Sequence, residues 1–144
     1  MKPTPVDRCL CLSEWQGSRK KGRITKTMKN ILKLEELAML GLGIYLFTLL
    51  PYDWWLFAAF FFAPDLGMLG YLVNSKIGAF TYNLFHHKGI AIAVYLAGIF
   101  TANTILMFAG IILFAHSSFD RLLGYGLKYT DNFKNTHLGF IGKN

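Results

Sequence analysis

The sequence FFFAPDLGMLGYLV, residues 60–73, combines the composition of a membrane-spanning helix with two residues that interrupt one. Pro64 removes a backbone hydrogen-bond donor and clashes with the preceding turn, so it kinks or ends a helix. Asp65 places a carboxylate among apolar side chains, which costs on the order of 3 kcal/mol at the centre of a bilayer. Such a residue faces the interior of a helix bundle and has partners there. We therefore expect Asp65 to belong to a polar site.

The whole chain has the composition of a membrane protein. Its 144 residues are 53% hydrophobic, whereas soluble domains contain about 45–50% apolar residues. These residues gather in blocks of the length that a bilayer core requires, rather than at amphipathic spacing. The pattern predicts an all-α, polytopic membrane protein.

Four apolar blocks predict four transmembrane helices, joined by short turns. The blocks are residues 31–50, 54–73, 77–100 and 103–123. The predicted organisation is a basic, disordered leader in residues 1–30, a transmembrane domain in 31–123 and a cytoplasmic tail in 124–144. Because MKNILKLEELAML reads like a natural start at Met28, residues 1–27 are either an upstream extension or a disordered tail.

The distribution of Lys and Arg predicts the orientation. Basic residues occupy the leader, the turn at Lys76 and the tail, whereas the first and third turns have none. The positive-inside rule then puts both termini in the cytoplasm of a bacterium, with the chain in its inner membrane. Membrane lipids are the expected partners, a homo-oligomer is left open, and nucleic-acid binding is not expected because the basic cluster lacks interleaved aromatic residues.

Polar residues in three of the predicted spans lie at similar depths. With a rise of about 1.5 Å per residue, Asp65, His86 and His116 lie about 10–13 Å from the cytoplasmic ends of their spans. Asp120 follows His116 by four residues and so shares its helix face. Imidazole and carboxylate ligands from three helices suit a divalent metal ion, zinc first, with manganese or iron as alternatives.

Each of these residues also has a purely structural interpretation. Asp65 can accept a hydrogen bond from Tyr71 or Asn83, and His116 with Asp120 can form a local pair that orients the helix. His87, beside Lys88 and Gly89, is typical of a solvated residue at a helix break.

Four motifs in order resemble the domain of unknown function 4260, a family of small bacterial integral membrane proteins. The motifs are APDLGMLGY, GAFTYNLFHH, AHSSFDRLLGYGLKY and FKNTHLGFIGK, and the resemblance covers residues 31–144. It matches the family's residues at Glu35, His86 and His137. The resemblance implies the membrane class and no particular activity.

The same motifs are also similar, more distantly, to inner-membrane-bound metal-dependent hydrolases. The similarity runs through Pro64, Asp65, His86, His87, His116, Asp120 and Gly124. The arginine that follows the first histidine of the central motif in that family is missing here. The similarity favours a metal site at these residues.

Together these observations predict a metal-dependent hydrolase of a lipid or other membrane-proximal ester or phosphoester. The expected ligands are Asp65, His86, His116 and Asp120. Glu35 would be a general base or a support for the ligands, and His137 a further ligand or acid.

Two alternatives from other functional classes stay open. The first is a small dimeric proton-coupled transporter that uses Glu35. The second is a b-type haem protein with His86 and His116 as axial ligands.

The orientation is testable with a reporter enzyme that is active only in the periplasm. Because the basic residues hold both ends in the cytoplasm, a fusion after Asn144 should be inactive and an insertion near Asp53 should be active. The reverse pattern would contradict both the topology and the depth estimate.

Overall fold

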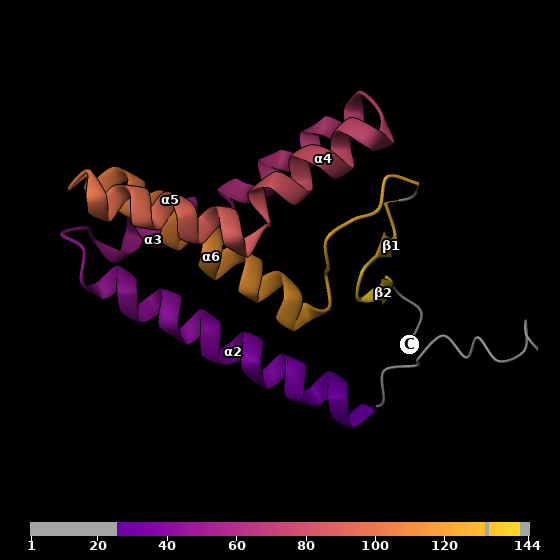
Figure 1. Ribbon diagram of the computed structural model, residues 1–144, viewed down its shortest axis with the longest axis horizontal. Helices are drawn as coiled ribbons and strands as arrows, with labels where there is room; N and C mark the ends of the chain where they lie inside the picture. The colour runs from indigo at the N-terminus through magenta and orange to yellow at the C-terminus, as the bar shows by residue number, and fades with distance from the viewer. Residues whose placement is uncertain (1–25, 132, 142–144) are drawn as a thin grey trace, which may run out of the picture. The chain divides into compact units, whose positions relative to one another are not determined.

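The computed structural model describes residues 26–131 and 133–141, and this part is mainly helical (Figure 1), as the sequence predicts. The predictions for residues 1–25 lie outside the described residues. The chain divides into two compact units, Met1–Asn30 and Ile31–Asn144. Apart from the start of α2, all the features below belong to the second unit. The elements are α2 (Lys26–Thr48), α3 (Trp54–Phe60), the 3-10 helix η1 (Ala63–Leu72), α4 (Ser75–Phe85), α5 (Lys88–Phe100), α6 (Thr104–Leu123), β1 (Asn135–Thr136) and β2 (Gly139–Phe140).

The second apolar block, expected as one span, is two helices. The α-helix α3 ends at Phe60, and Pro64 stands in the first turn of η1. Proline suits the start of a helix because the backbone N–H that it lacks would have no partner there. The interruption puts Asp65 in the first turn of η1, at a bend in the chain rather than inside a continuous helix.

The third block is also broken, at the two adjacent histidines. His86 is the C-cap of α4, and its backbone N–H donates to the carbonyl of Tyr82 at 3.0 Å. His87 takes an extended conformation as the N-cap of α5, and its Nδ1 accepts from the backbone N–H of Ile90 at 3.4 Å. The expectation of one helix over 77–100 is therefore wrong, because side-chain capping at His87 starts a new helix.

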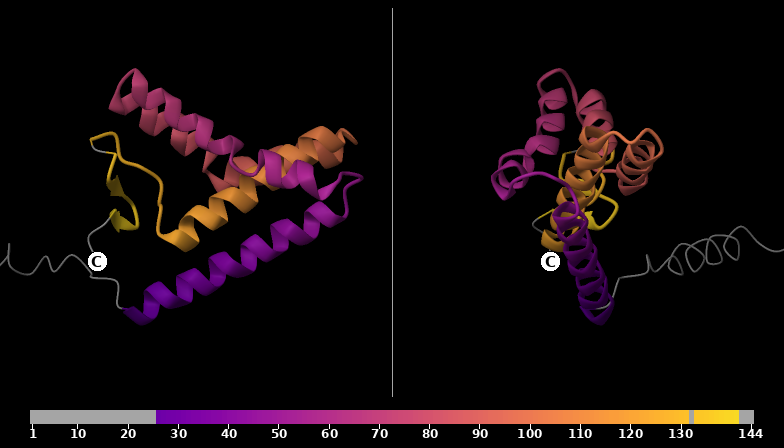
Figure 2. Two further views of the ribbon diagram at one scale, coloured as in Figure 1. Left: turned by 180° about the vertical axis from the view of Figure 1, so that it is seen from behind. Right: turned by 90° about the vertical axis from the view of Figure 1, so that its left-hand side faces the viewer.

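Between these two breaks, η1 and α4 lie side by side and form a hairpin. The hairpin projects away from the packed pair of helices α5 and α6 (Figures 1 and 2). Glycines allow the two helices of the hairpin to approach closely. A Cβ at Gly67 would lie 2.9 Å from the ring of Phe85. The hydroxyl of Thr81 donates to the carbonyl of Gly67 at 2.7 Å and so ties η1 to α4.

The first and fourth blocks form α2 and α6, close to their predicted bounds. Asn103 caps α6 by accepting from two backbone N–H groups, and Gly124 ends it with a positive φ of 96°. Phe47 and Leu50 from the end of α2 and its following turn pack with Ile111 of α6 in a buried core. Tyr95 of α5 packs against this core.

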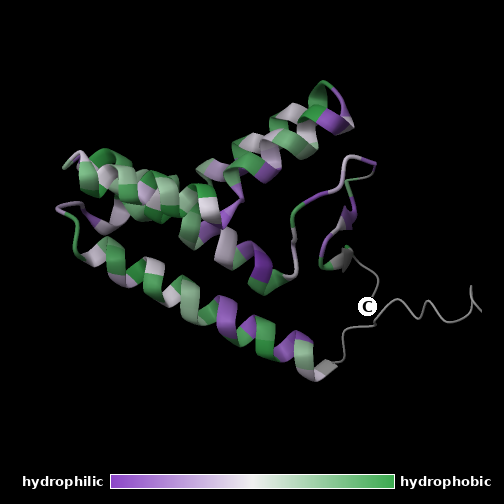
Figure 3. Cartoon of the chain, viewed as in Figure 1, coloured by the Kyte–Doolittle hydropathy of each residue, from purple (hydrophilic) through white to green (hydrophobic). Residues whose placement is uncertain are grey.

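Two helical stretches of the described chain are long and apolar enough to cross a membrane, by length and composition. They are Trp54–Leu72, which contains α3 and η1, and Thr104–Leu123, which is α6. The apolar helix Lys88–Phe100 is shorter. Hydrophilic residues gather in the first half of α2, at the end of α6 and in the tail (Figure 3).

The tail after α6 folds back along itself and onto α4. Strands β1 and β2 pair antiparallel, and Lys128 forms a bridge with Thr136. The side-chain amide of Asn83 donates to the Lys128 carbonyl at 2.8 Å, and its oxygen accepts from the Lys128 N–H at 2.7 Å. These two hydrogen bonds attach the tail to α4.

The contact between α5 and α6 depends on Gly110. A Cβ at Gly110 would lie 2.6 Å from the backbone nitrogen of Tyr95, so Gly110→Ala should lower the free energy of unfolding by about 1–3 kcal/mol. Thermal unfolding in mild detergent measures this. The control is Gly41→Ala in α2, where a Cβ meets nothing within 4 Å. Equal stability of the two variants would contradict the close α5–α6 contact.

Candidate metal centre

Four buried or half-buried polar side chains converge where the hairpin meets α6. Asp65 comes from the start of η1, His86 from the end of α4, and His116 and Asp120 from α6. One ligand atom from each of the four lies within 4.8 Å of all the others. The structure thus brings together the four residues that the sequence predicts as ligands, and we call them the His–Asp group.

Each carboxylate of the group faces both imidazole rings. The Nε2 atom of His86 lies 3.6 Å from Asp65 Oδ1 and 3.3 Å from Asp120 Oδ2. The Nε2 atom of His116 lies 3.3 Å from Asp65 Oδ1 and 3.8 Å from Asp120 Oδ1. The side chain of Asp65 is 38% exposed, against 12% for Asp120 and 3% or less for the histidines. Access to the group is therefore on the Asp65 side.

These distances are close to those between the ligands of one tetrahedral metal ion, although Asp120 faces the two histidines with different oxygens. Nitrogen and oxygen ligands bind zinc at about 2.0–2.2 Å, so two ligands of one tetrahedron lie about 3.3–3.6 Å apart. Three of the four nitrogen–oxygen distances fall within that range, and the fourth, between His116 and Asp120, is 3.8 Å. The group also offers two carboxylates, whose charge a divalent cation would neutralise.

The hydrogen bonds of His86 favour a free lone pair at Nε2. Its Nδ1 lies 2.9 Å from the backbone carbonyl of Tyr82, and because a carbonyl only accepts, this nitrogen carries a proton. Nε2 is buried and has no hydrogen-bond partner among the described residues. In a neutral ring, its lone pair faces two carboxylates, and a cation between them would relieve the repulsion. A backbone carbonyl that orients the far nitrogen is common for metal-binding histidines.

Tyr82 supports the His–Asp group in a second way. Its hydroxyl donates to Asp120 Oδ2 at 2.8 Å. Its ring stacks on the His86 ring with centroids 3.8 Å apart. One buried tyrosine therefore orients a carboxylate and an imidazole from two different helices.

His116 has one hydrogen-bond partner, Asp65 Oδ1 at 3.3 Å, and otherwise packs mainly against apolar side chains. The ring is 1% exposed and packs edge-on against Phe61 and Phe62, which precede η1. Its Nδ1 is buried without a hydrogen-bond partner in the described part of the chain. In this respect His116 departs from the usual metal-binding histidine, whose second nitrogen donates to an acceptor.

Two predicted catalytic residues lie outside the His–Asp group. Glu35 is exposed on α2. The neighbouring Glu36 instead pairs with the Lys88 ammonium, and an Arg121 nitrogen lies 3.9 Å from its carboxylate. His137 is exposed in the tail, where its Nδ1 accepts from the backbone N–H of Leu127 at 2.8 Å.

The structural alternatives for other residues hold in part. His87 is exposed at a helix break, as its interpretation as a solvated residue predicts. Asn83 does not join the His–Asp group, because both ends of its amide bind the tail backbone.

Lys128 is a residue near the group that the sequence analysis did not identify. It is 3% exposed, and its Nζ lies 4.4 Å from the centre of the Tyr82 ring. Burial lowers the pKa of Lys128 to about 8, although the carboxylates of Asp120 and Asp65 act in the opposite direction. In the sequence it stands among polar tail residues, and only the Asn83 contact moves it next to the site.

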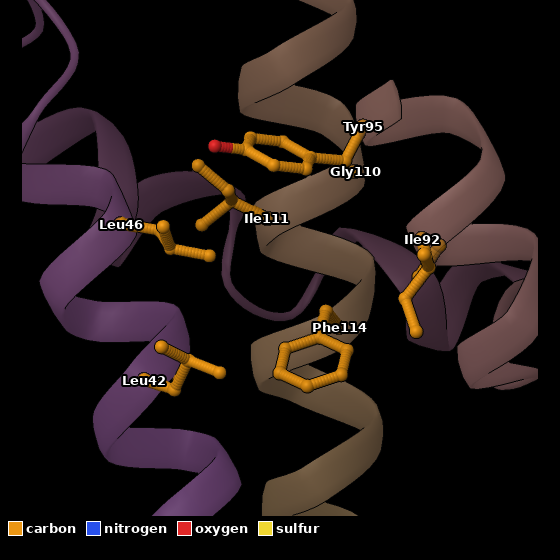
Figure 4. Close-up of a pocket in the computed structure, with 8 residues that line it drawn as sticks. Leu42, Leu46, Ile92, Tyr95, Gly110, Ile111 and Phe114 are labelled. Atoms are coloured by element: carbon orange, nitrogen blue, oxygen red, sulfur yellow. The ribbon is translucent and has the colours of Figure 1, made fainter. Parts of the chain in front are cut away.

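A separate apolar cavity of about 140 Å³ lies between α2, α5 and α6 (Figure 4). Its lining is Leu42, Leu46, Ala91, Ile92, Tyr95, Gly110, Ile111 and Phe114. None of these side chains carries a charge, so the cavity does not contribute to a metal site.

The family comparison agrees with the resemblance in the sequence. Residues 29–141 match the family model described as Domain of unknown function (DUF4260), and the chain therefore belongs to that family. Neither a comparison with curated proteins nor one with solved structures finds a match.

The pKa of Lys128 predicts a pH-dependent stability. Between pH 8 and about 10.4, the usual lysine pKa, the unfolded chain holds a proton that the folded chain has lost, so the free energy of unfolding rises with pH. Lys128→Met removes this rise. Denaturant unfolding should show that the free energy of unfolding of the variant exceeds that of the wild type by the largest amount below pH 8. The difference should be smaller at pH 10.

Lys76 is exposed at the tip of the hairpin, and Lys76→Met is the matched control for that measurement. A constant difference between Lys128→Met and the wild type over this pH range would mean that Lys128 is not buried.

Proposed function

We propose that this member of the DUF4260 family is a membrane-embedded metal-dependent hydrolase of a lipid or membrane-proximal ester or phosphoester. The observation that carries the proposal is the spacing in the His–Asp group, where three of the four nitrogen–oxygen distances, at 3.3–3.6 Å, match those between ligands of one small cation. Zinc fits this ligand set first, with manganese or iron as alternatives.

A divalent ion at this position would lower the pKa of a coordinated water and so supply a nucleophile for hydrolysis at neutral pH. The residues of the chain would supply the rest. Tyr82 fixes the tautomer of His86 through its carbonyl and the orientation of Asp120 through its hydroxyl. Asp65, as the most accessible of the four, borders the path by which a substrate would approach.

The membrane setting of the proposal is a four-span protein of the bacterial inner membrane with both termini in the cytoplasm. Two stretches with the length and composition of membrane helices support it. Large apolar side chains are also exposed along the described chain, among them Leu34 at 67%, Ile105 at 68% and Phe100 at 86%. Exposed apolar surface on this scale fits contact with lipid.

The two broken spans are compatible with this setting. Irregular backbone at membrane depth is tolerated where it is buried in protein or lines a cavity. Here the break after α3 and the break at His86 both adjoin the His–Asp group, where polar side chains replace solvent.

The haem alternative is not favoured by the geometry. Axial histidines lie on opposite faces of the macrocycle, whereas the His86 and His116 rings are edge-on with centroids 5.0 Å apart. Both rings also face the same two carboxylates.

One observation favours the transporter alternative. Glu35 is exposed on α2 and shares its helix face with Ile31, 57% exposed, and Leu32, 41% exposed. A carboxylate on such an apolar face needs a partner in a membrane. A second copy of the chain would supply one, and Glu35 would then be available for proton coupling in a dimer.

Elemental analysis of protein purified in mild, chelator-free detergent tests the hydrolase proposal. The wild type should contain a stoichiometric divalent metal. Asp65→Asn, His116→Ala and Asp120→Asn should each lose it, because each removes one ligand of the same site. Double substitutions should be hardly worse than single ones, since one loss already empties the site.

The adjacent histidines provide a matched control. His86→Ala should lose the metal, whereas His87→Ala should retain it, because His87 points away from the group as the exposed cap of α5. A wild type without metal would reject the hydrolase and leave the transporter as the better proposal. Metal that survives all the substitutions would lie elsewhere in the chain.

A further inference from the structure

The geometry points to an anion-binding site beside the His–Asp group, with the Lys128 ammonium and the Tyr71 hydroxyl as its donors and a phosphate ester as its ligand. This inference rests on the proposed function and narrows it, because it selects a phosphoester over a carboxylic ester.

Lys128 is a cation buried among aromatic rings. Its side chain is 3% exposed, and its Nζ has no hydrogen-bond partner among the described residues. Aromatic rings surround it instead, with centres 3.2 Å away in Phe133, 4.4 Å in Tyr82 and 5.5 Å in Tyr71. These rings attract a cation, but they leave its three N–H donors without an oxygen acceptor.

Tyr71 adds a second buried donor next to Lys128. Its hydroxyl also has no hydrogen-bond partner in the described chain. The ring is held on one side by Gly78, where a side chain would clash with it, and on the other by Phe133, with ring centres 5.1 Å apart. An unsatisfied buried donor is costly. The centre of the Tyr71 ring lies 5.5 Å from Lys128 Nζ, so the two donors favour a ligand that accepts from both.

Tyr82 connects this pair to the His–Asp group. The face of its ring lies under the Lys128 ammonium, while its hydroxyl binds Asp120 and its ring stacks on His86. Because Lys128 and His86 lie on opposite faces of the Tyr82 ring, a ligand at Lys128 would be separated from the proposed metal by this one side chain.

The charge balance selects the chemical class of the ligand. A divalent cation would neutralise the two carboxylates of the group, and Lys128 then leaves one positive charge without a counter-ion. A phosphate ester brings negative charge and several acceptor oxygens. A neutral carboxylic ester brings no charge and would leave the buried ammonium uncompensated.

The tail holds Lys128 in this position through its backbone. Asn83 binds both the N–H and the carbonyl of Lys128, and the bridge to Thr136 fixes the same residue from the tail side. Asn83 is therefore a positioning residue, since it acts on the ligand only through Lys128.

Calorimetric titration of the full-length protein in mild detergent with sodium orthophosphate tests the inference. The wild type should bind phosphate, and Lys128→Met should weaken binding about tenfold to a hundredfold through loss of a charge-assisted hydrogen bond. Tyr71→Phe should weaken it less, because the lost hydroxyl is neutral. Lys76→Met, exposed at the tip of the hairpin, should bind like the wild type.

A parallel titration with dihexanoyl phosphatidic acid distinguishes the two sources of phosphate. Tighter binding than orthophosphate, with the same dependence on Lys128, would identify a lipid headgroup. Equal binding would identify a soluble phosphoester. Either result supports the anion site.

The outcomes that reject the anion site differ from those that reject the hydrolase proposal. Phosphate binding that is absent from the folded wild type, or unchanged in both Lys128→Met and Tyr71→Phe, rejects the anion site. Binding lost only in Asp120→Asn would assign the anion to the metal group and also reject it. Metal content measured on the same samples tests the hydrolase separately, because Lys128→Met should retain the metal.

Discussion

Two carboxylates share one small volume in this protein, and the surrounding structure is arranged around that constraint. Asp65 Oδ1 and Asp120 Oδ1 lie 3.3 and 3.8 Å from the same nitrogen of His116. The ligand atoms of the group, including one oxygen from each carboxylate, lie within 4.8 Å of one another. Two like charges this close repel strongly where bulk water does not screen them. Protons on the imidazoles or a metal ion between the ligands would relieve this repulsion. The orientation of His86, with Nδ1 bound to a carbonyl and Nε2 toward the carboxylates, is compatible with both.

The breaks in the helices follow from the same constraint. A straight α-helix through Pro64 would lose a hydrogen bond and clash with the preceding turn. The chain also breaks between His86, the C-cap of α4, and His87, the N-cap of α5. The chain instead ends α3 and α4 near the group and begins η1 and α5 there. The hairpin between the breaks is held together by close approach at its glycines and by the Thr81 hydroxyl.

A second set of charges lies apart from the His–Asp group and has a different role. Glu36 of α2 pairs with Lys88 at the start of α5 and lies near Arg121 of α6. The three residues link three helices and satisfy one another's charge, which is typical of a structural ion-pair network. Lys128 differs from Lys88 because it has aromatic neighbours in place of a carboxylate. Lys88 therefore has its charge satisfied, whereas the Lys128 ammonium has no hydrogen-bond partner among the described residues and can donate to a ligand.

The sequence by itself determined the helical class, the bounds of α2 and α6, and the four residues of the His–Asp group. These follow from local properties: the length of apolar blocks, the i, i+4 spacing of His116 and Asp120, and the high cost of polar side chains in an apolar segment. Only the tertiary structure decided that Glu36 rather than Glu35 pairs with charges on other helices, and that Lys128 rather than His137 approaches the group. Neighbouring residues on a helix differ by about 100° in direction, and the position of a tail residue depends on where the tail docks. Both are set by contacts between distant segments, such as Asn83 with Lys128, which no local pattern contains.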